Sequence, residues 1–152
     1  MSSNQLIVFN LGLEEYAVNI SYAHEIMRIP RITPIPGVPG FVQGVINLRE
    51  KIIPIFDLKQ RFNMDKGKLG ADSRLLILDL DGIKAGIIVD DVSEVIRVDS
   101  SSIEHLPNEI SSISGNSIEG VIINNQRIII ALNILKLKTE IFKYNLEKEI
   151  SK

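Results

Sequence analysis

The sequence predicts an all-β protein with minor α-structure, arranged as two similar β-rich lobes. Two segments occur twice without a gap: residues 44–58 return as 120–134, and residues 11–29 return as 80–98. Repeated sequence indicates repeated supersecondary structure. Ile and Val supply 37 of the 152 residues, against 8 aromatic residues, which is typical of strands packed through branched aliphatic side chains. We expect about five short strands per lobe, few enough for each lobe to curl into a small barrel.

The first copy begins with two strands, at residues 5–11 and 16–20. Ser21 is the expected N-cap of one helical turn, and a third strand follows at 25–29. Four prolines within residues 30–39 then impose an extended, irregular connection, because proline fixes φ and removes a backbone donor. Such a stretch can serve as a polyproline II ligand or as a rigid connector.

A hairpin completes the first copy, with strands at 41–48 and 51–56 that turn at Arg49 and Glu50. Both strands are apolar, so the turn stands at the tip of an apolar hairpin. Pro54 lies inside the second strand, and we expect it at an edge or a bulge, where its missing N–H is not needed.

The two copies are connected by a short helix and a loop. Asp57 is placed to cap a helix at 58–62. Residues 63–73 are polar, contain glycine and lack an apolar period, which indicates a mobile loop or hinge. The second copy then opens with strands at 74–80 and 84–89, and the Asp-Gly pair between them is a strong hairpin signal because glycine accepts positive φ.

The rest of the second copy follows the same order. A strand at 92–98 precedes a long serine-rich loop at 99–117, which matches the proline-rich connection of the first copy. The last two strands, at 117–123 and 126–132, turn at two asparagines. After them, apolar residues at helical spacing predict an amphipathic C-terminal helix at 134–148.

Composition excludes several function classes. The formal net charge of −2 gives no electrostatic footprint for nucleic acid or for an anionic membrane. The absence of cysteine excludes disulfides, a thiol nucleophile and thiolate metal sites. The N-terminus has no basic region before its apolar run, and no apolar segment approaches the roughly 20 residues that span a bilayer. We therefore expect a soluble intracellular protein without membrane insertion.

The residue types that carry catalytic and metal chemistry are sparse and scattered. His24 and His105 have no neighbouring carboxylate at ligand spacing, so we expect solvated or partly packed histidines. No glycine-rich phosphate loop and no nucleophile elbow occurs. The densest acidic group serves a turn and a strand connection rather than a converging oxygen cage, and comprises Asp79, Asp81, Asp90 and Asp91. The sequence therefore predicts no catalysis, no metal and no cofactor.

Arg49 is the candidate for a binding role. It occupies a turn position where the second copy has Asn125, and arginine is a common interface anchor whereas asparagine is an ordinary turn residue. A guanidinium there can fork onto a partner's carboxylate or carbonyl, or it can be an ordinary solvated side chain. Glu25 can form a surface ion pair with Arg28 or Arg49. Its counterpart Glu94 shows that the position accepts glutamate for structural reasons.

Several segments closely resemble the motifs of the CheW family, the bacterial chemotaxis coupling proteins. The matching residues are 36–49, which include the Asn-Leu-Arg triplet, 53–58, 86–95 and 120–133. The resemblance spans nearly the whole chain, from residue 5 to residue 137. One position departs from the family, which usually has glycine where this chain has Glu50, and this leaves the type of that β-turn open.

The resemblance implies one CheW-like domain over residues 1–152, folded as two intertwined SH3-like five-stranded β-barrels that share a core, plus the C-terminal helix. The barrels are expected at residues 14–70 and 71–138. It further implies a non-catalytic adaptor, monomeric when isolated, that couples the cytoplasmic tips of methyl-accepting chemotaxis receptors to the regulatory domain of the histidine kinase CheA. Such a protein is cytoplasmic and is recruited to membrane receptor arrays through protein contacts. A CheW-like scaffold in a non-chemotaxis receptor-kinase pathway is the alternative.

The resemblance also implies which residues bind. Receptor contact in the family uses the groove between the lobes, which by motif position gives Glu25, Val45, Ile46, Asn47, Leu48 and Arg49, with Val89 and Val92 on the facing lobe. Kinase contact uses the barrel ends, which gives Val38, Pro39 and Phe41.

Overall fold

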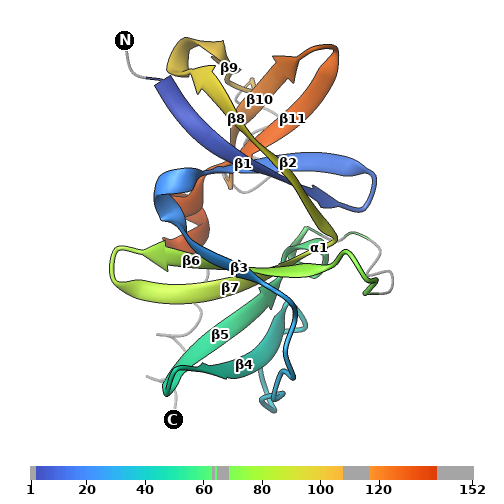
Figure 1. Cartoon of the computed structure of the whole chain (residues 1–152), viewed down its shortest axis with the longest axis vertical. Helices are drawn as coiled ribbons and strands as arrows, with labels where there is room; N and C mark the ends of the chain where they lie inside the picture. The colour runs from blue at the N-terminus through green and yellow to red at the C-terminus, as the bar shows by residue number, and fades with distance from the viewer. Residues whose placement is uncertain (1–2, 63, 65–68, 108–116, 140–152) are drawn as a thin grey trace.

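The computed structural model describes residues 3–62, 64, 69–107 and 117–139, and it is mostly β-structure in two sheets (Figure 1). The strands are β1 (Ser3–Leu11), β2 (Glu14–Asn19), β3 (Ala23–Met27), β4 (Val42–Leu48), β5 (Lys51–Asp57), β6 (Arg74–Leu80), β7 (Ile83–Val89), β8 (Asp91–Asp99), β9 (Ile103–Glu104), β10 (Ile118–Asn124) and β11 (Arg127–Leu132). The short helices are η1 (Ile20–Tyr22), α1 (Leu58–Arg61) and η2 (Ser100–Ser102). Parts of the two predicted loops, residues 63, 65–68 and 108–116, lie outside the described residues.

The two sheets form the two lobes of the molecule. One is six-stranded in the order β8-β1-β2-β11-β10-β9, and the other is five-stranded in the order β3-β6-β7-β5-β4. Among the described residues neither strand order closes on itself, so the lobes are open sheets rather than closed barrels. The predicted fold class, two β-lobes with little helix, is confirmed.

The two sequence copies exchange their first hairpins. β1 and β2 of the first copy join β8 and β11 of the second copy, whereas β6 and β7 of the second copy join β3 and β5 of the first. In both exchanges the first strand pairs antiparallel and the second strand pairs parallel. The sheets therefore do not follow the lobe ranges expected from chain order. Residues 14–19 lie in the six-stranded sheet, and residues 74–89 lie in the five-stranded sheet.

The exchange produces a core that both sheets share. Successive side chains of a strand point to opposite faces. In β1, Phe9 and Leu11 face the shared core, while Val8 faces a smaller core inside the six-stranded sheet. In β6, Leu76 and Leu78 face the shared core, while the alternate side chains of the strand line a second small core inside the five-stranded sheet. Two buried faces explain why these strands are hydrophobic without alternation.

A repeated glycine marks where each hairpin is crossed by another segment. A Cβ at Gly44 would clash with the carbonyl group of Thr33, and a Cβ at Gly120 would clash with the carbonyl group of Glu104. Thr33 bridges Val45 through two backbone hydrogen bonds of 2.9 Å each. Glycine at both positions therefore follows from the close approach of two backbones.

Pro54 lies in β5, which is an interior strand of its sheet. Its partner Val45 gives both its N–H and its carbonyl to Thr33, so Val45 and Pro54 are a pair without hydrogen bonds between them. The ladder to β7 begins only at Ile55. The missing N–H of Pro54 is thus not needed, although the strand is not at the edge of the sheet.

The predicted cap residue is correct for α1 and wrong for η1. The Asp57 carboxylate accepts the backbone N–H of Lys59 at 2.9 Å and caps α1, as predicted. The cap of η1 is Asn19 rather than Ser21, because the Asn19 side chain accepts the Ser21 N–H at 2.9 Å. Serine is therefore the first-turn donor here, not the cap.

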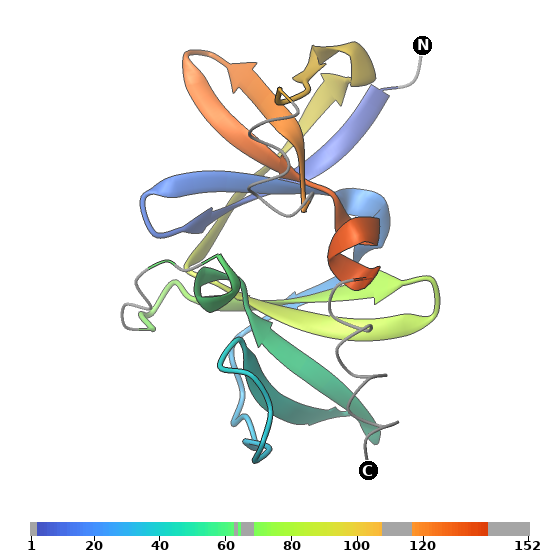
Figure 2. The ribbon, with the colours of Figure 1, turned by 180° about the vertical axis from the view of Figure 1, so that it is seen from behind.

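The C-terminal helix begins at residue 134, and residues 134–139 are helical. Asn133 caps it by accepting the Lys136 N–H at 3.1 Å. Ile134 and Leu137 are buried in the shared core, and Figure 2 shows the helix between the two sheets. The rest of the predicted helix, residues 140–148, lies outside the described residues. Among the residues that the structure describes, no helix has the length and apolar composition needed to cross a membrane.

Candidate functional site

The candidate site is built on the turn between β4 and β5. Arg49 and Glu50 both have positive φ, 50° and 67°, as a type I′ turn requires of its two central residues. The Asn47 side chain accepts the Glu50 N–H at 2.9 Å and holds the turn. Glu50 therefore adopts the left-handed conformation that glycine would adopt without strain. The matching turn of the second copy has the same geometry, with φ of 51° at Asn125 and 69° at Gln126.

The Arg49 guanidinium forks onto the carboxylate of Glu25 in β3. Its two terminal nitrogens donate to the two carboxylate oxygens at 2.8 and 3.3 Å. The Arg49 side chain is nevertheless 68% exposed, against 25% for Glu25. Of the two arginines that the sequence offered to Glu25, the structure selects Arg49. An exposed guanidinium held in a fixed direction is prepared for a further bidentate contact.

The ion pair changes the pKa of both groups. Hydrogen bonding from Arg49 lowers the pKa of Glu25 below its ordinary value, and the charges of Arg49, His24 and Lys84 lower it further. The same hydrogen bond and the Glu25 charge raise the pKa of Arg49. Both groups are therefore ionised at neutral pH.

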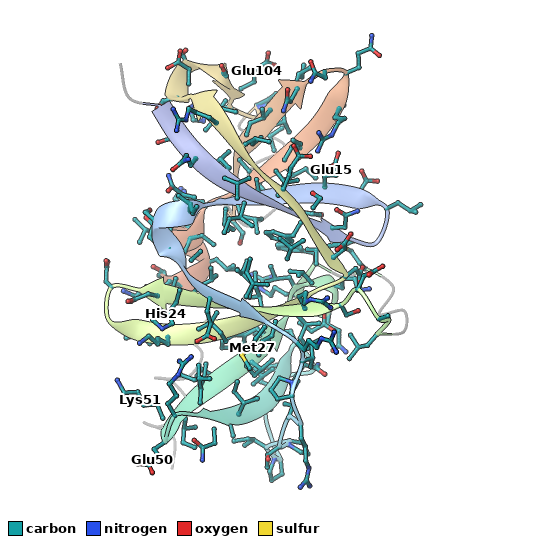
Figure 3. The ribbon with its side chains drawn as sticks, viewed as in Figure 1. Glu15, His24, Met27, Glu50, Lys51 and Glu104 are labelled. Carbon is teal, nitrogen blue, oxygen red and sulfur yellow. The ribbon has the colours of Figure 1, made fainter. Side chains whose placement is uncertain are left out.

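A pocket of about 240 Å³ opens beside Arg49. It is lined by His24, Leu48, Arg49, Lys51, Ile53 and Lys84, so β3, β4, β5 and β7 all contribute. Ile53 belongs to the small core of the five-stranded sheet and Leu48 packs against that core, which makes part of the wall apolar. Figure 3 shows His24 and Lys51 on the same side of this lobe, at the left of the view, with Glu50 at the tip of the turn.

The remaining predicted receptor residues separate into surface and core. On β4, Asn47 is exposed and Val45 is half-buried. Ile46 is 3% exposed and Val89 is fully buried, so neither side chain offers surface to a partner in this conformation. These two residues support the sheet rather than form its surface.

Val89 lies at the far end of the five-stranded sheet from Arg49, and Val92 lies in β8 of the six-stranded sheet, paired with Phe9 of β1. Lys84, which lines the pocket, and Val89 are five positions apart on β7, or about 17 Å. Val92 is half-buried and packs against the shared core. The structure therefore brings Glu25, Leu48 and Arg49 together and does not place the two valines with them.

The predicted kinase residues lie in the connection that leads into β4. Val38 and Pro39 are half-buried, and the Pro39 carbonyl accepts the Val42 N–H at 3.0 Å. The Phe41 ring stacks on the ring of Phe56 at 6.3 Å and packs against the shared core. Phe41 therefore anchors this connection, while Val38 and Pro39 present part of their surface.

The described residues include no group of three or more metal-ligating side chains. The residues around Arg49 combine charged groups with an apolar wall, a lining suited to contact with another protein.

Comparison with known proteins identifies relatives of the whole chain. The profile of the CheW-like domain matches residues 5–141. The chain is 36% identical over 137 residues to the chemotaxis protein CheW of Treponema pallidum, covering 88% of this chain and 81% of that protein. It is 32% identical over 134 residues to the chemotaxis protein CheW of Bacillus subtilis, with coverage of 88% and 84%.

A solved structure shares the fold. The crystal structure of the scaffolding protein TtCheW from Thermoanaerobacter tengcongensis superposes with a TM-score of 0.81 at 40% identity. The match covers 88% of this chain and 86% of that one.

Proposed function

This chain belongs to the CheW-like domain family, and from that membership we propose that it is a non-catalytic chemotaxis adaptor that couples chemoreceptor tips to the histidine kinase CheA. Relatives named chemotaxis protein and scaffolding protein support a scaffold role. The coupling of receptor to kinase, the site residues below, a monomeric state in isolation and recruitment from the cytoplasm to receptor arrays are parts of the proposal.

One observation carries the receptor half of this proposal. Arg49 stands at a hairpin tip, forked onto Glu25 and still 68% exposed. An interface arginine that is already oriented loses little conformational freedom on binding. A helical hairpin of a receptor can therefore place its apolar stripe along β4 while Arg49 fixes its register through charge-assisted hydrogen bonds.

The burial pattern narrows the proposed receptor surface. We place Glu25, Val45, Asn47, Leu48 and Arg49 in direct contact with the receptor. Ile46 and Val89 act through the packing of the sheet, since their side chains are buried. Val92 lies in β8 of the six-stranded sheet and contributes to a receptor contact only if the bound helix reaches that lobe.

The proposed kinase surface is the connection that contains Val38, Pro39 and Phe41. This segment consists of turns and a bend. Pro39 fixes its own φ and accepts the Val42 N–H, and Phe41 ties the segment to the shared core, so its conformation is fixed before binding. Separate receptor and kinase surfaces on one rigid body raise the effective concentration of each partner for the other, and this avidity reaches about 10²–10⁴-fold in favourable geometry.

Titration calorimetry with a receptor cytoplasmic hairpin fragment tests the receptor contact. We expect Arg49→Asp to lower the affinity by more than about 30-fold, as for a hot-spot residue, because it reverses the charge at the anchor. The matched control is Asn125→Asp at the equivalent turn, which is expected to bind as the unmodified protein does. Equal binding by the protein and Arg49→Asp would refute the proposed contact.

A CheW-like scaffold in a different receptor-kinase pathway is the alternative function. It would use the same surfaces with other partners. Binding of a chemoreceptor hairpin and the CheA regulatory domain favours the chemotaxis assignment, and binding of neither favours the alternative.

A further inference from the structure

We infer that the pocket beside Arg49 is a binding site for an acidic side chain of a partner protein, held by the ammonium groups of Lys51 and Lys84. The inference rests on the proposed adaptor function and specifies the partner chemistry that this surface accepts. Neither lysine is among the residues that the family resemblance assigns to binding.

Positive charge converges on the pocket from two strands and a turn. Lys51 begins β5, Lys84 lies in β7, and Arg49 stands in the turn between β4 and β5. Within the described part of the chain, Arg49 is paired with Glu25, and neither Lys51 nor Lys84 lies within ion-pair distance of a carboxylate. Arg49, Lys51, Lys84 and Glu25 together carry a formal charge of +2. Asp79, the cross-strand partner of Lys84, does not line the pocket and accepts the Gly82 N–H at 2.7 Å.

Glu50 follows Arg49 in the chain, but it does not line the pocket. Its side chain is exposed at the tip of the turn (Figure 3). The excess of positive charge in the pocket is therefore not offset from that side.

The second copy of the repeat provides an internal comparison. The position of Lys51 is occupied there by Arg127, and the position of Lys84 by Glu15. Arg127 donates to both oxygens of Glu15 at 3.0 and 2.6 Å and also pairs with Glu94 at 3.0 Å. Hydrogen bonds to Glu15 and Glu94 raise the pKa of Arg127.

The two equivalent sites, one in each sheet, therefore differ in whether their cations are paired with carboxylates. In the six-stranded sheet one cation is clamped between two carboxylates, which gives a formal charge of −1. In the five-stranded sheet the position that would supply the second carboxylate is a lysine instead. The side-chain cation is thus paired with carboxylates of the same chain in one lobe, whereas the equivalent site in the other lobe lacks the second acidic group.

The shape and lining of the pocket define the missing group. Leu48 and Ile53 supply an apolar wall and the lysines a cationic rim, so the pocket suits a glutamate or aspartate whose aliphatic stem packs against the wall. Lysine ammonium groups act as mobile point charges and can follow a carboxylate without a fixed fork geometry. Arg49, already oriented by Glu25, is the adjacent anchor.

The test uses the intact protein and hexaglutamate as the acidic probe, followed by amide chemical-shift changes in two-dimensional NMR. We expect saturable shifts at His24, Lys51 and Lys84, and none with hexaglutamine. The double variant Lys51→Gln/Lys84→Gln should weaken binding of the probe by about fivefold or more, as expected for the loss of two surface charge contacts. The control Lys136→Gln/Lys138→Gln removes the same charge outside the pocket and should leave the affinity unchanged.

Two results would overturn the inference: shifts that do not localise to the pocket, or an equal loss in the two double variants. Calorimetry with the receptor hairpin fragment separates this inference from the proposed function. If Arg49→Asp loses receptor binding while Lys51→Gln/Lys84→Gln binds as the unmodified protein does, the pocket assignment fails and the adaptor function stands. If the unmodified protein does not bind the fragment, the function fails, and the hexaglutamate titration still decides the pocket.

Discussion

At the scale of single residues, the sequence indicated that Glu25 could pair with an arginine but not that this arginine is Arg49. Arg49 differs from its repeat counterpart Asn125, and this difference predicts a binding role for Arg49. The partner of Glu25 could not be chosen between Arg28 and Arg49 by spacing, because the two strands involved, β3 and β4, are not paired with each other. Only the three-dimensional path of the chain brings the two side chains together.

The titration of Glu25 follows from this pair. Arg49 lowers the pKa of Glu25. A lowered folded-state pKa means that the pair stabilises the folded protein above the ordinary glutamate pKa, and that this contribution is lost as the pH falls through the lowered value. We expect Arg49→Gln to raise the pKa of Glu25 toward its ordinary value of about 4.3. Carboxyl carbon shifts in an NMR pH titration measure this, and an unchanged midpoint would contradict the ion pair.

The left-handed residues of the two equivalent turns give a second prediction. An L-residue in this conformation costs about 1–2 kcal/mol, which glycine avoids, although glycine also loses more freedom on folding. Glu50→Gly should therefore raise the free energy of unfolding by about 0.5–1 kcal/mol. Gln126→Gly is the matched variant at the same turn position and should behave alike. Urea denaturation checks both, and destabilisation by both would refute the strain argument.

At the scale of elements, the sequence located nearly every strand because hydrophobic pattern and turn residues are local signals. The Asp-Gly turn, the Asp57 cap and the Arg49-Glu50 hairpin all appear where they were predicted. The cap of η1 was misplaced because Asn19 and Ser21 are both good cap residues, and only the backbone conformation distinguishes them. Lys84 was missed at the site, although its opposite charge to Glu15 in the repeat was a readable signal.

Gly44 and Gly120, where another segment crosses each hairpin, allow the close packing of the two backbones to be tested. Gly44 has φ of 140°, and a Cβ there would meet the Thr33 backbone, which cannot move without breaking its bridge to Val45. Gly44→Ala should lower the free energy of unfolding by about 3 kcal/mol or more. Gly70→Ala is the control, since a Cβ at Gly70 meets nothing within 4 Å. Equal stability of the two variants in urea denaturation would contradict the close backbone approach.

At the scale of the whole molecule, the hairpin exchange is the property that no local pattern could predict. Strand-forming residues in β1 and β6 are similar, so either could pair with β3 or β8 by propensity alone. The exchanged pairing buries one face of each hairpin in the shared core. This stabilisation depends on contacts between segments that are distant in the sequence. Chain order therefore gave the correct number of lobes but the wrong membership of their strands.

Asp90 makes a charged contact that links segments belonging to the two sheets. Asp90, between β7 and β8, accepts the Lys59 ammonium at 2.9 and 3.0 Å and the Gly12 N–H at 2.7 Å. It thereby joins α1 to the turn between β1 and β2. The Lys59 side chain is only 8% exposed, so Lys59→Ala should lower the free energy of unfolding by about 2–3 kcal/mol. Leu135→Ala is the control: Leu135 follows the end of the second repeat as Lys59 follows the first, and its side chain is exposed. This change should cost much less, and equal costs in thermal unfolding would contradict the role of Lys59.

The exchange also predicts that neither copy folds alone. Residues 1–72 would lack β6 and β7, the partners of β3 and β5, and would expose the hairpin of β1 and β2 without β8 and β11. We expect the full chain to unfold in one cooperative transition and this fragment to show no strand signal in circular dichroism. A fragment that unfolds cooperatively would contradict the interdependence of the lobes.

The proposed joining of a receptor to a kinase can be tested by sedimentation velocity of a three-component mixture. The mixture contains the protein, a chemoreceptor cytoplasmic hairpin fragment and the CheA regulatory domain. We expect a species that contains all three and that disappears when the protein is omitted or carries Arg49→Asp. Sedimentation of receptor and kinase fragments as separate species in the presence of the unmodified protein would contradict it.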